Sequence, residues 1–145
     1  MSDDYYRHVI REVFSRYKKS TLKMLVHFFV PLFKSDVPEI SVDELYEKLK
    51  ITKPPLLIDI RSVEEYNGGY GHIPNALSIP ILDLESKIEE LQSYKEREIV
   101  TMCPGGGMSL VAVEILTEAG FKKVKSLIGG TDLWHEKGHP LTLSQ

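Results

Sequence analysis

The residues "EIVTMCPGGGMSLVAVEILTEAG", positions 98–120, are the most informative stretch of this chain. An apolar, β-branched run leads into a cysteine and three glycines, and a segment with apolar residues at helical spacing follows. A buried strand, a glycine-rich loop and a helix in this order are typical of α/β proteins. We therefore predict a strand over 98–102 and a helix over 109–119, with Gly120 as the stop signal.

The flanking sequence repeats this alternation of strand and helix. Strands are predicted in "PPLLIDI" (54–60), "LSIP" (77–80) and "VKSLI" (124–128). Capping boxes at Ser41 and Ser62 predict helix starts, and further helices are expected over 84–93 and 131–137. Strands that alternate with helices predict a mainly parallel, five-stranded sheet with helices on both faces.

Length and composition narrow the function classes. A chain of 145 residues with net charge −3 and 42% hydrophobic residues fits one folded domain. A single cysteine excludes an internal disulfide and a cysteine-built zinc site, and we expect no metal ion and no cofactor. The polar N-terminus is unlike a signal peptide, and no apolar stretch approaches the roughly 20 residues of a membrane span. These features favour a cytoplasmic protein.

The first 36 residues differ in charge from the rest. Residues 1–36 carry a net charge of +3 and residues 37–145 carry −6. Apolar pairs at helical spacing predict an N-terminal amphipathic helical extension over 1–36, with "KSDVPE" (34–39) as a linker to a domain over 37–145. Residues 5–33 are expected to pack on their own domain, on a second copy or on a partner protein. A membrane surface is less favoured, and no nucleic-acid binding is expected.

Cys103 is the candidate functional residue. Sites in open α/β sheets lie at the carboxyl ends of the strands, and Cys103 follows such an end. The unpaired N–H groups of the next helix, its dipole and the converging amides of the glycines all favour an anion. This position suits a nucleophilic thiolate. The alternative is a small buried apolar residue beside an ordinary turn.

Two further motifs flank the cysteine loop. "LLIDIRSVEEYNGGYGHIPNALSIP" (56–80) contains Asp-x-Arg, Glu-Tyr and Gly-His-Ile-Pro-x-Ala, and "VKSLIGGTDLWHEKGHPL" (124–141) contains Gly-Gly before Trp and Gly-x-Pro. With the cysteine loop between them, the chain from about residue 40 to 141 resembles a single rhodanese-like domain. The resemblance implies the α/β fold of that family.

The resemblance also implies a sulfurtransferase or persulfide carrier. In the family, a thiolate takes sulfane sulfur from a donor such as thiosulfate, polysulfide or a persulfide and passes it to a thiol or cyanide. By resemblance, Cys103 is the nucleophile, and Asp59 and Arg61 support the site by hydrogen bonds or ion pairs. The loop that cradles the persulfide consists of Pro104, Gly105, Gly106, Gly107, Met108 and Ser109.

The sequence departs from the family pattern in its loops. The family loop often reads Cys-x-x-Gly-x-Arg followed by Ser or Thr, whereas Met108 stands here in place of the arginine. An arginine would supply a forked, charged donor for an oxyanion, so thiosulfate is expected to be a poor donor and a less charged one is favoured. The stretch between Tyr66 and His72 is longer than in common members. A non-catalytic or redox-sensing rhodanese-like binding module remains the alternative.

Overall fold

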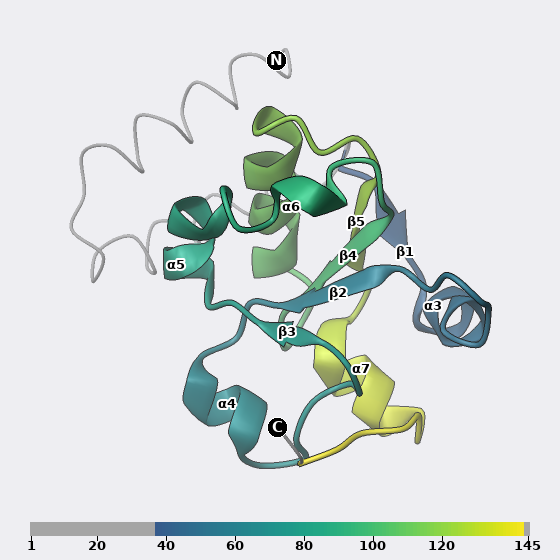
Figure 1. Cartoon of the computed structure of the whole chain (residues 1–145). Helices are drawn as coiled ribbons and strands as arrows, with labels where there is room; N and C mark the ends of the chain where they lie inside the picture. Colours follow the sequence, from purple (N-terminus) through teal and green to yellow (C-terminus); the bar gives the residue numbers. More distant parts are fainter. Residues whose placement is uncertain (1–36, 144–145) are drawn as a thin grey trace.

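The computed structural model describes residues 37–143, which form a five-stranded sheet with the order β1-β5-β4-β2-β3 (Figure 1). Every pair of neighbouring strands is parallel, as predicted. The strands are β1 (Glu39–Ile40), β2 (Leu56–Asp59), β3 (Leu77–Ser78), β4 (Ile99–Met102) and β5 (Val124–Leu127). The helices are α3 (Val42–Lys48), α4 (Val63–Asn67), α5 (Ile81–Leu84), α6 (Met108–Glu118) and α7 (Gly130–Glu136), with 3-10 turns η2 (Glu85–Lys87) and η3 (Gln92–Tyr94).

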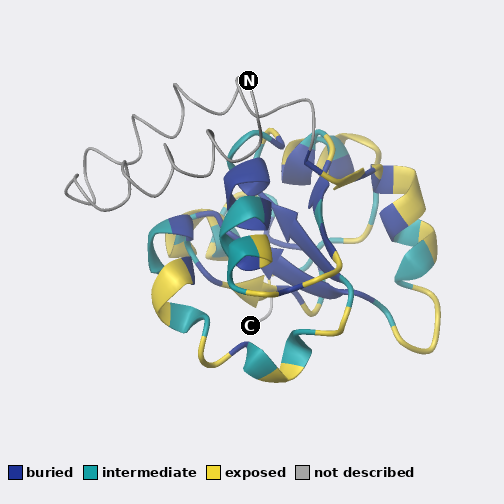
Figure 2. Ribbon diagram, turned by 90° about the horizontal axis from the view of Figure 1, so that it is seen from above, coloured by how far each residue is buried: buried dark blue, intermediate teal, exposed yellow. Residues whose placement is uncertain are grey.

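Helices cover both faces of the sheet, which confirms the predicted layers. α5 and α6 lie on one face, and α3 and α7 lie on the other (Figure 1). Alternate residues of β2 serve the two apolar clusters, because Leu56 and Ile58 pack towards α6 while Leu57 packs towards α7. All four residues of β2 and of β4 are buried (Figure 2). Strands covered on both faces read as continuous apolar runs, which is why the sequence showed them clearly.

The predicted helix starts are formed by side-chain caps. Ser62 accepts a hydrogen bond from the N–H of Glu65, and the carboxylate of Glu65 accepts one from the N–H of Ser62, so this capping box is complete. Ser41 likewise accepts from the N–H of Glu44 at 3.1 Å. α6 begins at Met108, one residue earlier than predicted, and the chain reverses after it at Gly120 with φ +97°.

The predicted helix over 84–93 is wrong. α5 ends at Leu84, and the chain continues through η2 and η3 with hydrogen bonds between residues three apart. Ile88, Leu91 and Tyr94 all pack against the same apolar cluster. Residues three apart line up along one side of a 3-10 helix, so these side chains stay on the core side of the tighter turns.

The predicted linker over residues 34–39 is wrong at its C-terminal end, residues 37–39. Glu39 is the first residue of β1, the carbonyl of Pro38 accepts the N–H of Ser126, and Val37 is only 8% exposed. These residues belong to the sheet and its core. The helical extension predicted over residues 1–36 lies outside the described residues. None of the helices in residues 37–143 has the length and apolar character needed to cross a membrane.

Candidate functional site

Three neighbouring strands deliver the predicted site residues to one edge of the sheet. β4 ends directly before Cys103, and β2, its neighbour on one side, ends at Asp59. β5, its neighbour on the other side, is followed by Gly129 and Gly130. Parallel strands place their carboxyl ends together, so the cysteine lies between the acidic residue and the glycine pair, in the position where α/β proteins bind ligands.

The sulfur of Cys103 lies within the loop formed by residues 103–109, called the cysteine loop below. The N–H of Gly106 donates to Sγ at 3.1 Å, and the N–H of Ser109 donates to it at 3.4 Å. Cys103 is only 3% exposed. Two main-chain donors aimed at one sulfur atom stabilise negative charge on it, because charged acceptors form the stronger hydrogen bonds.

Two buried serines extend this contact. The thiol of Cys103 donates to the Oγ of Ser109 at 3.5 Å, and the Oγ atoms of Ser109 and Ser126 lie 2.6 Å apart. A hydroxyl rotates to donate or accept as needed. When Cys103 loses its proton, the hydroxyl of Ser109 can turn towards the sulfur and accept from Ser126 instead. The pair can therefore satisfy both the thiol and the thiolate.

Further amides of the cysteine loop are unoccupied. Within the described part of the chain, the N–H groups of Gly105, Gly107 and Met108 make no hydrogen bond to another residue. These groups come at the start of α6, where the helix dipole is positive. They are available to an anion or to a second sulfur atom bound to Cys103.

The start of α7 holds the cysteine loop from its other side. The N–H of Thr131 donates to the carbonyl of Cys103 at 2.9 Å, and the N–H of Asp132 donates to that of Pro104 at 3.0 Å. Gly130 makes this approach possible: its φ is +65°, and a Cβ there would lie 2.0 Å from the carbonyl oxygen of Cys103. The close packing of α7 against the cysteine loop thus explains why the second motif has glycine at this position.

Met108 directs its side chain towards the apolar core. It is partly buried and packs against the cluster that α5 and α6 form on their face of the sheet. No charged side chain of the cysteine loop accompanies the amides, because residues 103–109 contain none. Anion binding in this loop therefore relies on main-chain donors and the helix dipole.

Asp59 and Arg61 form a buried ion pair beside the cysteine loop. Nε and Nη2 of Arg61 donate to the two carboxylate oxygens of Asp59, with a shortest distance of 2.7 Å, and the side chains are 0% and 3% exposed. Burial lowers the pKa of Arg61, but the hydrogen bond and charge of Asp59 outweigh it and leave the pKa above its ordinary value. Neither residue bonds to the sulfur of Cys103.

Arg61 also holds the neighbouring segment, residues 62–71, which contains α4 and the turn after it and is called the tyrosine loop below. Its Nη2 donates to the carbonyl of Gly71 at 2.9 Å. Tyr70, at the end of this loop, donates to the carboxylate of Asp132 and lies 2.9 Å from the hydroxyl of Thr131. Burial, followed by the hydrogen bond to Asp132, raises the pKa of Tyr70, which keeps its hydroxyl protonated at neutral pH.

Sequence reasoning missed four residues that shape the site: Thr101, Ser126, Thr131 and Tyr70. The hydroxyl of Thr101 donates to the carbonyl of Ser109 at 2.9 Å, and the other three make the contacts given above. Two features of the sequence could have identified them. β4 carries Thr101 in an apolar run, β5 carries Ser126 between Lys125 and Leu127, and the longer stretch between Tyr66 and His72 contains Tyr70.

The described residues hold no group of three His, Cys, Asp or Glu side chains arranged to bind a metal ion. The chemistry that this edge of the sheet can support is that of its buried thiol and its main-chain donors. A thiolate here has a nucleophile's charge, and the free amides can receive a charged product on it.

Comparison with known proteins gives a consistent picture. A family model described as the rhodanese-like domain matches residues 41–137. A sulfurtransferase of Allochromatium vinosum is 33% identical over 105 residues, covering 72% of this chain and 94% of the relative. YrkF of Bacillus subtilis, whose name describes a sulfur carrier protein, is 32% identical over 103 residues, but the chain spans only 54% of its length.

Solved structures agree with the fold. A rhodanese-related protein of Thermoplasma volcanium superposes with a TM-score of 0.60 at 28% identity, covering 74% of this chain and 99% of that one. A thiosulfate sulfurtransferase of Pseudomonas aeruginosa has a TM-score of 0.71 at 25% identity, with 81% of this chain matching 22% of that one.

Proposed function

Because the chain belongs to the rhodanese-like domain family, we propose that it transfers sulfane sulfur and that Cys103 carries this sulfur as a persulfide. The observation that supports this role best is the pair of main-chain donors, from Gly106 and Ser109, on the sulfur of Cys103. An inert buried cysteine needs no such donors. Relatives named as a sulfurtransferase and a sulfur carrier support the same class of reaction.

The first step is attack of the Cys103 thiolate on the outer sulfur of the donor. An S–S bond forms at Cys103 while the S–S bond of the donor breaks, and its electron pair leaves with the remaining fragment. With thiosulfate the leaving fragment is sulfite, and with a protein persulfide or polysulfide it is a thiolate or a shorter polysulfide. The product on the protein is the anion Cys–S–S⁻, with no net change in charge across the step.

The second step returns the protein to its starting state. An acceptor thiolate, or cyanide, attacks the outer sulfur of the persulfide, and the S–S bond breaks with its electrons on Cys103. The acceptor leaves as a persulfide or as thiocyanate. Between the steps, the N–H groups of Gly105, Gly107 and Met108 are the donors available to the outer sulfur.

Donor preference follows from Met108. Without an arginine in the cysteine loop, the sulfonate end of thiosulfate meets only amides and the helix dipole. We therefore propose that a polysulfide or a protein persulfide is a better donor than thiosulfate. Persulfide exchange needs a supply of thiols, so we propose a reducing compartment, the cytoplasm, as the location.

Intact-protein mass spectrometry tests the proposal. The reduced chain is exposed to inorganic polysulfide, and we expect an adduct of one sulfur atom that disappears with thiol reductant. Cys103→Ser removes the only thiol of the chain and is the control that must show no adduct. Transfer of the bound sulfur to cyanide, measured as thiocyanate, completes the cycle.

A second candidate function is a rhodanese-like binding module that senses redox state. The 3% exposure of Cys103 and the packing of Met108 into the core favour it, because both restrict access to the sulfur. The same experiment separates the two. A thiol that iodoacetamide still alkylates, but that takes no sulfur from any donor, would assign the chain to this second class.

A further inference from the structure

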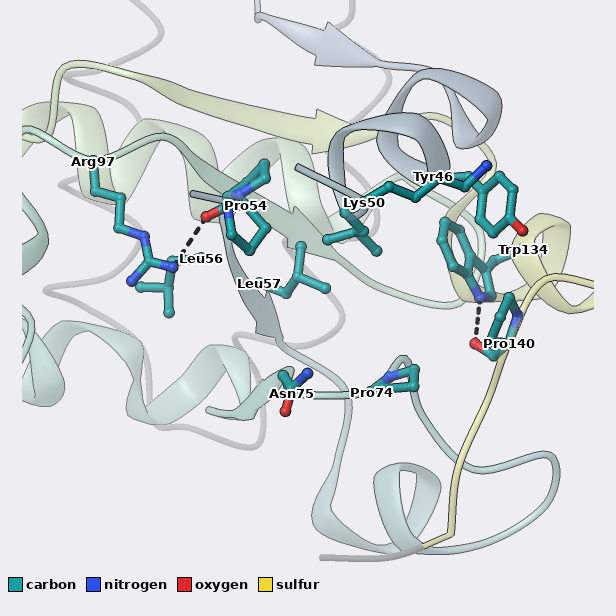
Figure 3. Close-up of a pocket in the computed structure, with 12 residues that line it drawn as sticks. Tyr46, Lys50, Pro54, Leu56, Leu57, Pro74, Asn75, Arg97, Trp134 and Pro140 are labelled. Carbon is teal, nitrogen blue, oxygen red and sulfur yellow. Dashed lines mark hydrogen bonds between the residues drawn. The ribbon is translucent and has the colours of Figure 1, made fainter. Parts of the chain in front are cut away.

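A pocket of about 510 Å³ opens at the opposite end of the sheet from Cys103 (Figure 3). Pro54 and Pro55 precede β2, and Arg97 precedes β4. The other walls come from α3 and α7 with the residues that follow them, and from the segment before β3. Because the strands are parallel, residues before them lie at the amino edge, whereas the cysteine loop lies at the carboxyl edge. The pocket shares no residue with the proposed sulfur-transfer site.

The walls of this pocket are apolar and aromatic at one end. Trp134 and Tyr46 meet edge to face with ring centroids 6.2 Å apart. The Nε1 of Trp134 donates to the carbonyl of Pro140 at 2.9 Å, so the polar atom of the indole is satisfied (Figure 3). Trp134 is only 1% exposed, so it lies beneath the surface of the pocket, whereas Tyr46 is partly exposed. Leu57 of β2 also lines the pocket. Leu57 is only 2% exposed, so the apolar surface that a ligand can contact comes from Tyr46, Leu49, Pro54 and Pro74.

The charged residues that line the pocket are both cations. Arg97 lies at the end away from Trp134 (Figure 3). It donates one N–H to the carbonyl of Pro54, at 3.0 Å, which leaves other donors of its five available. Lys50 pairs with Glu47 at 3.0 Å, and Glu47 is not part of the lining. This cationic lining stands out in a domain whose residues 37–145 carry −6.

We propose that this pocket binds a small organic anion with an apolar body, with that body against the partly exposed Leu49, Pro54 and Pro74 and the carboxylate or sulfonate at Arg97. The volume lies within the roughly 300–1,000 Å³ of small-molecule sites, and an apolar surface with few fixed polar groups is their usual composition. A guanidinium held at one end supplies a charge-assisted contact for the acid. This site is independent of sulfur transfer, and neither proposal depends on the other.

A matched pair of fluorescent probes tests the proposal on the full chain. 8-Anilinonaphthalene-1-sulfonate and N-phenyl-1-naphthylamine share their rings and differ in the sulfonate. Trp134 is the only tryptophan of the chain, so energy transfer from it reports binding at this pocket. We expect one sulfonate probe per chain and an affinity at least about tenfold higher than that of the neutral probe.

Two substitutions at one position separate charge from structure. Arg97→Gln keeps a donor for the carbonyl of Pro54 and should abolish the preference for the sulfonate probe, whereas Arg97→Lys should retain it. Lys87→Gln is the control. Lys87 lines a second pocket, of about 330 Å³, next to β3, and its loss should change nothing.

Three results of the probe measurements would overturn the proposal. They are equal affinity for the two probes, loss of sulfonate binding in Lys87→Gln, and unchanged binding in Arg97→Gln. Quenching of Trp134 that rises with protein concentration in the absence of probe would place a second copy of the chain in the pocket and would also reject the small anion.

Discussion

The cysteine loop and the tyrosine loop lie side by side at the carboxyl edge of the sheet, yet they are held in different ways. The cysteine loop is fixed by its main chain: amides point at the sulfur of Cys103, and the start of α7 holds the carbonyls of Cys103 and Pro104. The tyrosine loop is fixed by side chains, through Arg61 and the hydroxyl of Tyr70.

This difference determines which positions of each loop are sensitive. A loop held by main-chain donors tolerates changes of side chain but depends on the glycines that allow close approach. A loop held by a buried ion pair and a tyrosine depends on the chemistry of those side chains and less on its backbone. The site therefore combines a cysteine loop that is held by its main chain with a tyrosine loop that is held by particular side chains.

Breaking the buried pair should have the largest effect on stability. Asp59→Asn keeps the shape of the side chain but leaves the charge of Arg61 uncompensated in the interior. We expect the free energy of unfolding to fall by about 3–5 kcal/mol. Urea unfolding with linear extrapolation measures it.

Asp43→Asn is the matched control for this change. Asp43 pairs with Lys137 at 2.8 Å, but the two side chains are 69% and 41% exposed, so little change is expected. Hydrogen bonds from Lys137 and then His139 lower the pKa of Asp43, yet water screens the pair. Equal losses in the two variants would show that the ion pair at Asp59 is not what holds the tyrosine loop.

The cysteine loop should be most sensitive to a substitution at Gly130. Gly130→Ala places a Cβ 2.0 Å from the carbonyl oxygen of Cys103 and 2.5 Å from that of Pro104, with φ at +65°. The expected loss is about 2–4 kcal/mol of unfolding free energy, and sulfur transfer should fall with it. Chemical unfolding and thiocyanate formation are measured on the same preparation.

Gly138→Ala separates backbone strain from the clash. Its φ is +74°, but a Cβ there would meet nothing within 4 Å, so only the strain of about 1–2 kcal/mol is expected. A Gly130 variant no less stable than the Gly138 variant would mean that α7 moves away from the cysteine loop at no cost. The claim that main-chain contacts with α7 hold the cysteine loop would then be wrong.

The strands and the position of the site were predictable because local patterns encode them. β2 and β4 are buried on both faces, and their apolar runs are visible in any window of the sequence. Cys103 follows one of these runs, so its place at the sheet edge followed from topology alone. Capping at Ser62 is equally local, since it depends on residues three apart.

The remaining features depend on contacts between distant residues. Tyr70 and Asp132 are 62 positions apart, and Ser109 and Ser126 are 17 apart and belong to different elements, so no local pattern of the sequence pairs them. β1 has two residues and is defined by its hydrogen bonds to β5. The winding of residues 85–94 follows from the core that they cover and not from their own propensity.

Met108→Arg should make the cysteine loop a better binding site for one donor, thiosulfate. A guanidinium added to the cysteine loop gains a charge-assisted contact to the sulfonate of thiosulfate, worth about 1.5–3 kcal/mol. If realised in the transition state, thiosulfate-to-cyanide transfer rises roughly ten- to a hundredfold, with little change for polysulfide. Steady-state thiocyanate formation with the two donors measures the difference.

Met108→Leu is the control for this substitution, because it keeps an apolar side chain against the core. It should leave both donors unchanged. An arginine that accelerates both donors equally would act on the thiolate of Cys103 and not on donor binding. An arginine that accelerates neither would show that a side chain at position 108 stays against the core and does not reach the donor, or that donor binding does not limit the rate.

The smallest effect is expected at the contact between the two loops. Tyr70→Phe removes the hydroxyl that reaches Thr131 and Asp132, but it keeps the ring stacked on His135, with centroids 4.5 Å apart. We expect about 1 kcal/mol less unfolding free energy and at most a roughly threefold change in alkylation of Cys103 by iodoacetamide. Because the pKa of Tyr70 is raised above its ordinary value of 10.0, the hydroxyl stays protonated and the effect should be constant from about pH 6 to about pH 9. An alkylation rate that changes tenfold or more would mean that the side chains of the tyrosine loop set the position of the sulfur. The cysteine loop could then no longer be described as held by its main chain alone.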